Sequence, residues 1–168
     1  MHLCPTISAC WSESGKQLKV VSPGDDEKYQ VFGSVDCRTG DLIYSQQDRK
    51  RTVEYLAHIE QILARWPDRP IVLICDNYSV HLAKKVKELE RKHFGRFMQV
   101  LLPTYSPTLN PIEMLWRQVR RWVTHNYRFD TLADLKQAAY STFDALGHVP
   151  SQVLSIIGGR RLQPTEAT

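Results

Sequence analysis

Two acidic residues, Asp76 and Glu113, stand at positions where their carboxylates could hold a metal ion. Asp76 directly follows Ile71–Cys75, an apolar run that predicts a central strand buried on both faces. In open α/β sheets, ligands bind beyond the carboxyl ends of the strands. The alternative is an aspartate that only stabilises the turn after the strand, which is a common role at such a transition.

Glu113 lies in the first turn of a predicted helix. Asn110 is a suitable N-cap and Pro111 suits the first helical position, so Glu113 could simply close a capping box and favour the helix dipole. At about 100° per residue, however, Glu113 falls beside the apolar stripe of this helix. The stripe consists of Ile112, Leu115, Trp116, Val119, Trp122 and Val123. A helix that buries this stripe against a sheet would present Glu113 at its edge, where it and Asp76 could bind magnesium through hard oxygen ligands.

The elements that must position these two residues alternate along the chain. An irregular segment, with one possible strand at 17–21, precedes a hairpin of strands at 29–36 and 41–45. The hairpin is followed by a helix at 52–66, a strand at 71–76, a helix capped by Ser79 that ends near residue 92, a strand at 97–102, and helices at 111–125 and 131–146. This order predicts an α/β fold with a sheet of mixed direction. We expect one domain over residues 1–150 and a tail over residues 151–168.

The overall composition is that of an ordinary globular domain. The 168 residues are 42% hydrophobic and 24% charged. No stretch approaches the roughly 18 apolar residues of a membrane helix. The N-terminus carries no signal sequence, and the four cysteines show neither a CxxC pair nor zinc-ligand spacing, so we expect a reduced protein of the bacterial cytoplasm. A net charge of +4 favours a polyanionic partner without identifying one.

The segments around the two acids carry a specific pattern. Asp76 is followed by Asn77 and His81, and Glu113 lies in the string Tyr-Ser-Pro-Thr-Leu-Asn-Pro-Ile-Glu-Met-Leu-Trp at 105–116. Together they resemble the second and third parts of the DDE signature of transposases in the Tc/mariner superfamily, within its bacterial insertion-sequence branch. The resemblance covers nearly the whole chain and weakens after about residue 150. It implies a ribonuclease H-like mixed sheet flanked by helices.

The same resemblance implies an activity, which is metal-dependent DNA strand cleavage and strand transfer during insertion-sequence transposition. Asp76 and Glu113 would be catalytic residues and would hold two Mg²⁺ or Mn²⁺ ions. The implied partners are transposon ends and target DNA. The active assembly would be a homodimer associated with the bacterial nucleoid.

The family's first metal-binding aspartate lies on the first strand of the fold, just before the stretch with which this sequence opens. We therefore expect this strand and its aspartate to be missing here, together with the helix-turn-helix that reads the transposon ends. Asp25, Asp26, Asp36 and Asp41 are weak replacements, because all four are typical of turns and solvent-exposed positions. The chain could therefore be a fragment that cleaves DNA only when completed.

Other residues near the acids could support them. Asn77 and His81 could orient a metal ligand by hydrogen bonding to it without contacting the metal themselves. Arg117, Arg120 and Arg121, on the same helix as Glu113, could contact DNA phosphates, although charged runs are often only solvated.

Two other functions compete with the transposase hypothesis. One is a catalytically inactive remnant or split-gene fragment that only binds DNA or a partner chain, which the missing aspartate favours. The other is a related ribonuclease H-like nuclease or resolvase, which the string at 105–116 disfavours.

Overall fold

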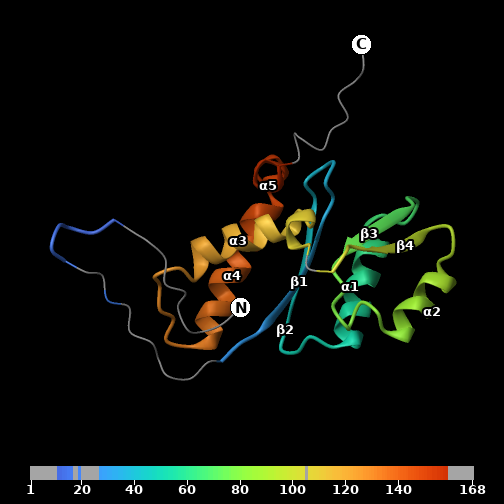
Figure 1. Cartoon of the computed structure of the whole chain (residues 1–168), viewed down its shortest axis with the longest axis horizontal. Coiled ribbons are helices and arrows are strands. Elements are labelled where there is room, and N and C mark those ends of the chain that lie inside the picture. The colour runs from blue at the N-terminus through green and yellow to red at the C-terminus, as the bar shows by residue number, and fades with distance from the viewer. Residues whose placement is uncertain (1–10, 17–18, 20–26, 105, 159–168) are drawn as a thin grey trace, which may run out of the picture.

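The computed structural model describes residues 11–16, 19, 27–104 and 106–158 (Figure 1). The elements are β1 (Gln30–Val35), β2 (Leu42–Gln47), α1 (Thr52–Arg65), β3 (Ile71–Cys75), α2 (Lys84–Lys92), β4 (Phe97–Leu101), a short 3₁₀ helix (Pro107–Leu109), α3 (Ile112–Val123), α4 (Leu132–Gly147) and α5 (Pro150–Ile157). Within these ranges, no helix has the length and apolar character that crossing a membrane requires. The strand expected at 17–21 lies almost entirely outside the described residues.

The expected hairpin is confirmed, because β1 and β2 pair antiparallel from Gln30↔Gln47 to Val35↔Leu42. Asp36 makes the turn: its carboxylate accepts hydrogen bonds from the backbone amides of Arg38 (2.8 Å) and Thr39 (3.3 Å). Gly40, at the end of this turn, has a φ of +82°, which favours glycine, and a Cβ there would collide with the backbone of Pro150. The turn and helix α5 therefore pack directly against each other.

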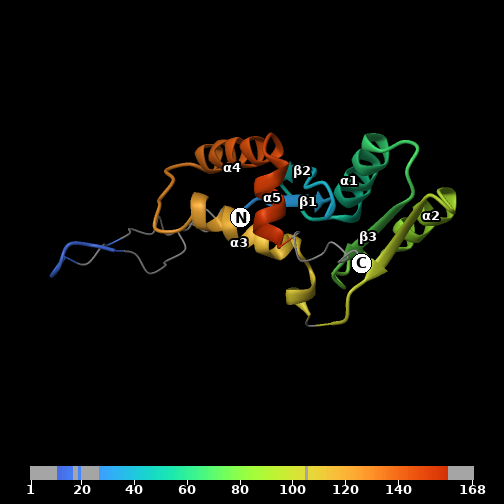
Figure 2. The ribbon, with the colours of Figure 1, turned by 90° about the horizontal axis from the view of Figure 1, so that it is seen from above.

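The hairpin separates two hydrophobic cores. One face presents Val31, Val35 and Tyr44 to a core built from α3, α4 and α5. The opposite face presents Phe32 to a second core formed with α1, α2, β3 and β4. Figures 1 and 2 show α3, α4 and α5 gathered beside the hairpin at one end of the molecule and β3, β4 and α2 at the other.

β3 and β4 form a parallel pair, from Ile71↔Phe97 to Cys75↔Leu101, as strands joined by a helical crossover should. The prediction that β3 is buried on both faces is wrong. Val72 and Ile74 are 56% and 51% exposed, because only the opposite face of the strand packs against α1 and α2. Antiparallel and parallel pairing are both present, as expected, but the described strands form two separate two-stranded sheets, not one.

The helices differ from the predictions in two places: α2 starts later than expected, and α5 was not expected. Residues 79–83 form tight turns, and α2 starts only at Lys84, after Ala83, without a side-chain cap. Residues 150–157, most of which we expected in a tail, form α5, and its Val153 and Ile157 are buried in the core with α3 and α4. The folded unit therefore extends at least to Ile157.

Candidate functional site

Asp76 follows the last residue of β3, and its side chain is 57% exposed. Its carboxylate accepts a hydrogen bond from the backbone amide of Tyr78 at 3.2 Å. Nδ1 of His81 lies 2.9 Å from Asp76 Oδ1 and 3.0 Å from the Asp76 carbonyl oxygen. Both of these oxygens are acceptors, so Nδ1 must carry the proton that it donates. The carboxylate is thus held on one side and remains open to solvent on the other.

His81 is held from behind by two residues on other elements. Its side chain is only 10% exposed, and its ring lies 4.4 Å from the ring of Tyr55 on α1. Gln99 on β4 donates a hydrogen bond to the His81 carbonyl oxygen at 3.0 Å and accepts one from the Tyr55 hydroxyl at 2.8 Å. Contacts from α1 and β4 therefore fix the histidine that contacts Asp76.

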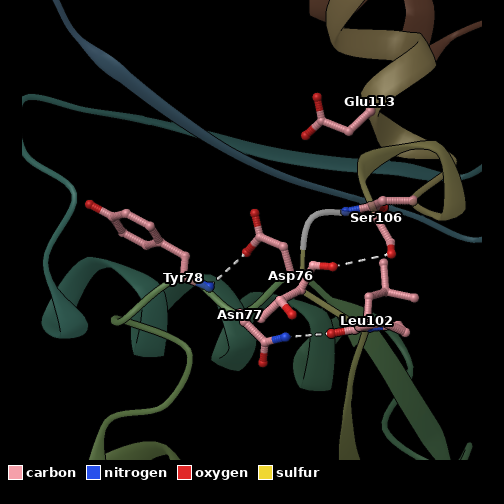
Figure 3. A pocket seen from close by; sticks show the side chains of 9 residues that line it. Asp76, Asn77, Tyr78, Leu102, Ser106 and Glu113 are labelled. Carbon is pink, nitrogen blue, oxygen red and sulfur yellow. Dashed lines mark hydrogen bonds between the residues drawn. The ribbon is translucent and has the colours of Figure 1, made fainter.

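The Asn77 side chain bonds to the backbone at the end of β4 and not to Asp76. Its amide donates to the carbonyl oxygen of Leu102, while the Leu102 amide donates to the carbonyl oxygen of Cys75 at 2.8 Å. Figure 3 shows the bond from Asn77 to Leu102, and the two bonds together hold the ends of β3 and β4 next to each other. Asn77 thus positions the loop that carries Asp76, and no hydrogen bond joins the two side chains.

Glu113 lies in the first turn of α3, and its backbone amide donates to the Asn110 carbonyl oxygen at 3.0 Å. No side chain caps this helix, so the alternative in which Glu113 closes a capping box with Asn110 is wrong. In Figure 3, the Glu113 side chain reaches from α3 toward the space above Asp76. The helix geometry therefore leaves this carboxylate available for a ligand.

Asp76 and Glu113 line two adjoining cavities. The first, of about 360 Å³, is also lined by Asn77, Tyr78, Leu102, Pro103, Thr104, Ser106 and Asn110. The second, of about 100 Å³, lies between β1 and β3 and is also lined by Asn110. Two carboxylates and an amide are thus common to both cavities. Oxygen ligands of this kind suit a hard divalent cation such as Mg²⁺.

Of the four aspartates considered as replacements for a third ligand, Asp36 and Asp41 do not join this pair. Asp36 stabilises the hairpin turn, and Asp41 lies 4.0 Å from Arg65 at the surface. Neither lines the two cavities. Asp25 and Asp26 lie outside the described residues. Among the residues that the structure describes, no group of three or more His, Cys, Asp and Glu side chains is placed to hold a metal ion.

The basic residues of α3 lie on its solvent-exposed side. Arg117, Arg120 and Arg121 are exposed, and none forms an ion pair with another described residue. The buried side of the helix is the predicted one, with Leu115 and Val119 at 0% and 1% exposure. Trp122, which we expected in the core, is 47% exposed because it lies at the margin of the apolar stripe.

Four residues around Asp76 are not predicted from the sequence: Lys50, Tyr55, Tyr78 and Gln99. Helical periodicity assigns Tyr55 only to the apolar side of its helix, and Lys50, Tyr78 and Gln99 belong to no motif. The ammonium group of Lys50 lies 3.9 Å from the centre of the Tyr78 ring. Nothing in the local sequence pattern signals these contacts, because they join segments that are distant along the chain.

Comparison with known proteins identifies the family. The sequence profile described as DDE superfamily endonuclease matches residues 2–136. The chain belongs to this family. Asp76 and Glu113 both lie within the matched region. The profile thus spans the whole candidate site.

Two curated relatives agree with the resemblance to Tc/mariner transposases. The chain is 29% identical over 136 residues to the insertion element IS630 uncharacterized 39 kDa protein of Shigella sonnei, covering 80% of the chain and 39% of that protein. It is 40% identical over 76 residues to the transposable element Tcb2 transposase of Caenorhabditis briggsae, covering 42% of the chain and 27% of that protein. The chain thus spans well under half the length of either relative.

Solved structures confirm the fold. The Mos1 strand transfer complex superposes with a TM-score of 0.65 at 16% identity, covering 96% of this chain and 49% of that one. The mariner Mos1 paired-end complex with Mn gives 0.64 at 14% identity, with coverages of 92% and 51%. The mariner Mos1 paired-end complex with Mg superposes with a TM-score of 0.58 at 17% identity, covering 92% of this chain and 50% of that one. The predicted ribonuclease H-like α/β fold is therefore correct.

Proposed function

We propose that this chain is the catalytic domain of a transposase that cleaves DNA strands and joins them to a target. The observation that carries this proposal is the meeting of Asp76 and Glu113, from β3 and α3, at the same two cavities within a DDE superfamily domain. The solved relatives with this fold are described as strand transfer and paired-end complexes of Mos1, which supports a DNA substrate.

Asp76 and Glu113 are the proposed ligands of divalent ions, Mg²⁺ or Mn²⁺, with two ions in the complete site. When bound, such ions activate an attacking hydroxyl and stabilise the leaving oxygen in phosphoryl transfer. The oxygen-rich cavities fit this chemistry, since the Asp76 carboxylate is exposed and Asn110 lines both cavities together with the two acids. Mos1 has been solved with Mn and with Mg, which supports this choice of metals.

The protein's own side chains have separate tasks in this proposal. His81 holds the Asp76 carboxylate in place through its Nδ1 proton. Asn77 fixes the loop that follows β3 and carries Asp76, through its hydrogen bond to the Leu102 carbonyl oxygen. The exposed arginines of α3, Arg117, Arg120 and Arg121, would bind phosphates of the DNA as it approaches Glu113. Together they would position the scissile phosphate beside the two carboxylates.

The partners of this domain belong to the proposal as well. We propose that it acts on transposon ends and target DNA as a homodimer in the bacterial cytoplasm, at the nucleoid. Sedimentation of the chain with and without an end-derived duplex would measure its assembly. A complex containing one protein chain at saturating DNA would contradict the homodimer.

The test of the catalytic proposal is nicking of supercoiled plasmid in Mg²⁺ or Mn²⁺, measured together with Mn²⁺ binding by electron paramagnetic resonance. Asp76→Asn and Glu113→Gln should each abolish nicking and weaken Mn²⁺ binding, whereas Glu60→Gln, an exposed acidic position on α1, should change neither. Full nicking by Glu113→Gln would refute the assigned site.

A catalytically inactive remnant that binds DNA or a partner chain is the second candidate. It is favoured by the finding that only two carboxylates, not three, meet at the cavities among the described residues. A chain that binds duplex DNA but neither nicks plasmid nor binds Mn²⁺ would have this function.

A further inference from the structure

Lys50 has a position that the proposed mechanism does not yet use. It lies between β2 and α1, is half-buried, and lines the cavity between β1 and β3 together with Asp76 and Glu113. Among the described residues that line the two cavities at the acid pair, Lys50 is the only lysine or arginine. A cation at this place faces whatever anion approaches the carboxylates.

Among the residues that the structure describes, an aromatic ring, and no carboxylate, partners the Lys50 ammonium group. Its ammonium group lies 3.9 Å from the centre of the Tyr78 ring, and the Tyr78 backbone amide donates to Asp76. Of the charged residues close to Lys50 in the sequence, Asp48 pairs with Lys136 at 2.7 Å. Likewise, Arg51 pairs with Glu54. None of the ion pairs among the described residues includes Lys50.

This arrangement keeps the lysine available for an anionic ligand. A cation over an aromatic face is attracted to the ring without forming a hydrogen bond to a carboxylate. An ammonium group has three N–H donors, and these remain available. The ring thus holds the charge beside the cavity that Asp76 and Glu113 also line, and leaves donors for another acceptor. An ion pair with a carboxylate would have used them instead.

We propose that Lys50 binds a phosphate of the DNA beside Asp76 and Glu113, from the side formed by β1 and the start of α1. This inference rests on the proposed function, because it takes DNA as the substrate. Lys50 would complement the arginines, which lie on a different element, α3. It would also offset repulsion between the two carboxylates and the phosphate that must come close to them.

The test measures binding of a fluorescently labelled duplex to the intact chain by anisotropy, in Mg²⁺ and over a series of NaCl concentrations. Each phosphate contact contributes about 0.9 to the slope of log K against log salt. Lys50→Gln should therefore lower that slope by about 0.9, and Lys50→Arg should restore it. Arg49→Gln removes the neighbouring charge, which is exposed and lines neither cavity, and should leave the slope unchanged.

A second measurement identifies the lysine directly. The chain is acylated with an amine-specific reagent in the presence and absence of saturating duplex, and modification of Lys50 is quantified by mass spectrometry. The duplex should protect Lys50 at least severalfold in the wild-type chain. Tyr78→Phe, which keeps the aromatic face, should retain this protection, and Tyr78→Leu should reduce it.

The outcomes separate this inference from the proposed function. An unchanged slope for Lys50→Gln, or equal acylation of Lys50 with and without duplex, would overturn it. An equal loss of slope in Arg49→Gln would overturn the inference too, because the effect would then come from any positive charge near this position and not from Lys50 itself. Failure of the wild-type chain to bind Mn²⁺, measured separately, would contradict the proposed metal site. The salt slope of duplex binding and the protection of Lys50 from acylation decide whether Lys50 binds a phosphate.

Discussion

His81 contacts Asp76 twice, through one ring nitrogen that lies 2.9 Å from the carboxylate and 3.0 Å from the carbonyl oxygen. A donor shared between the side chain and the backbone of the same residue limits rotation of the carboxylate. The ring that carries this donor is itself packed against Tyr55. The geometry of Asp76 is thus set by a chain of contacts that ends in the core around α1.

Removing this donor should weaken metal binding more than it weakens the fold. His81→Ala is expected to lower Mn²⁺ affinity by about 10–100-fold, the usual effect of losing a group that orients a metal ligand. His81→Asn should restore much of the affinity, because its amide can donate from a position close to that of Nδ1. Mn²⁺ titration followed by electron paramagnetic resonance measures both variants. Equal affinities for His81→Ala and the wild type would show that Asp76 needs no such support.

The exposed arginines of α3 should contribute to DNA affinity through charge. Arg117→Gln, Arg120→Gln and Arg121→Gln are each expected to reduce the salt slope of duplex binding by about 0.9 per lost phosphate contact. Their loss should weaken binding to all sequences alike, since phosphates carry no base information. Arg69→Gln, at an exposed position before β3, is the matched control. A triple variant with the wild-type slope would show that these arginines are only solvated.

Features that are determined by residues close together in the sequence could be predicted, whereas features that depend on distant residues could not. The helical periodicity of α3 correctly places Leu115 and Val119 inside and Glu113 at the margin, because this pattern is local. Asp76 could likewise be placed at a strand end from the apolar run before it. These two local patterns place each acid on its own element, whereas the meeting of the two acids at shared cavities depends on how β3 and α3 are arranged in the fold.

Features that depend on neighbours distant in sequence could not be predicted in the same way. An apolar run such as Ile71–Cys75 does not reveal whether one or both faces are covered, and Val72 and Ile74 are in fact exposed. The contacts of His81 with Tyr55 and of Lys50 with Tyr78 join segments from different elements. No periodicity within one segment encodes such pairs.

Burial of His58 should make the protein less stable in mild acid. His58 is 2% exposed, stacks on Phe32 and has its Nε2 atom 2.9 Å from the Ser34 hydroxyl. Burial lowers its pKa from 6.5 to about 4. The unfolded chain therefore binds a proton more readily than the folded one, so stability is complete above pH 6.5 and falls as the pH drops toward 4. The loss attributable to His58 is on the order of 3 kcal/mol at most.

Urea unfolding at pH 7, 5.5 and 4.5 measures this effect. His58→Gln keeps a polar partner for Ser34 but cannot titrate, so its free energy of unfolding should depend less on pH in this window. Hydrogen bonds from Lys136 and Arg51 lower the pKa of Asp48 and of Glu54, but both carboxylates are common to the two chains, so their contributions cancel in the comparison. Parallel pH profiles for the two chains would mean that His58 does not control acid stability.

Gly33 lets Trp116, and with it α3, approach the hairpin. A Cβ at Gly33 would lie 2.7 Å from Cζ2 of Trp116 and closer still to Cη2, well inside van der Waals contact. The indole cannot move freely, because it also packs edge-on against Phe143 with ring centres 5.6 Å apart. Gly33→Ala should therefore cost about 1–3 kcal/mol of unfolding free energy, the typical effect of overpacking.

Because Trp116 lies one helical turn after Glu113, the same substitution should also weaken Mn²⁺ binding by displacing the start of α3. Trp116→Leu would leave room for the added methyl group, so Gly33→Ala should cost less in that background than in the wild type. Gly147→Ala, where an added Cβ meets nothing within 4 Å, is the control and should not lower stability. Additive costs of Gly33→Ala and Trp116→Leu would show that the hairpin does not set the position of α3 through this contact.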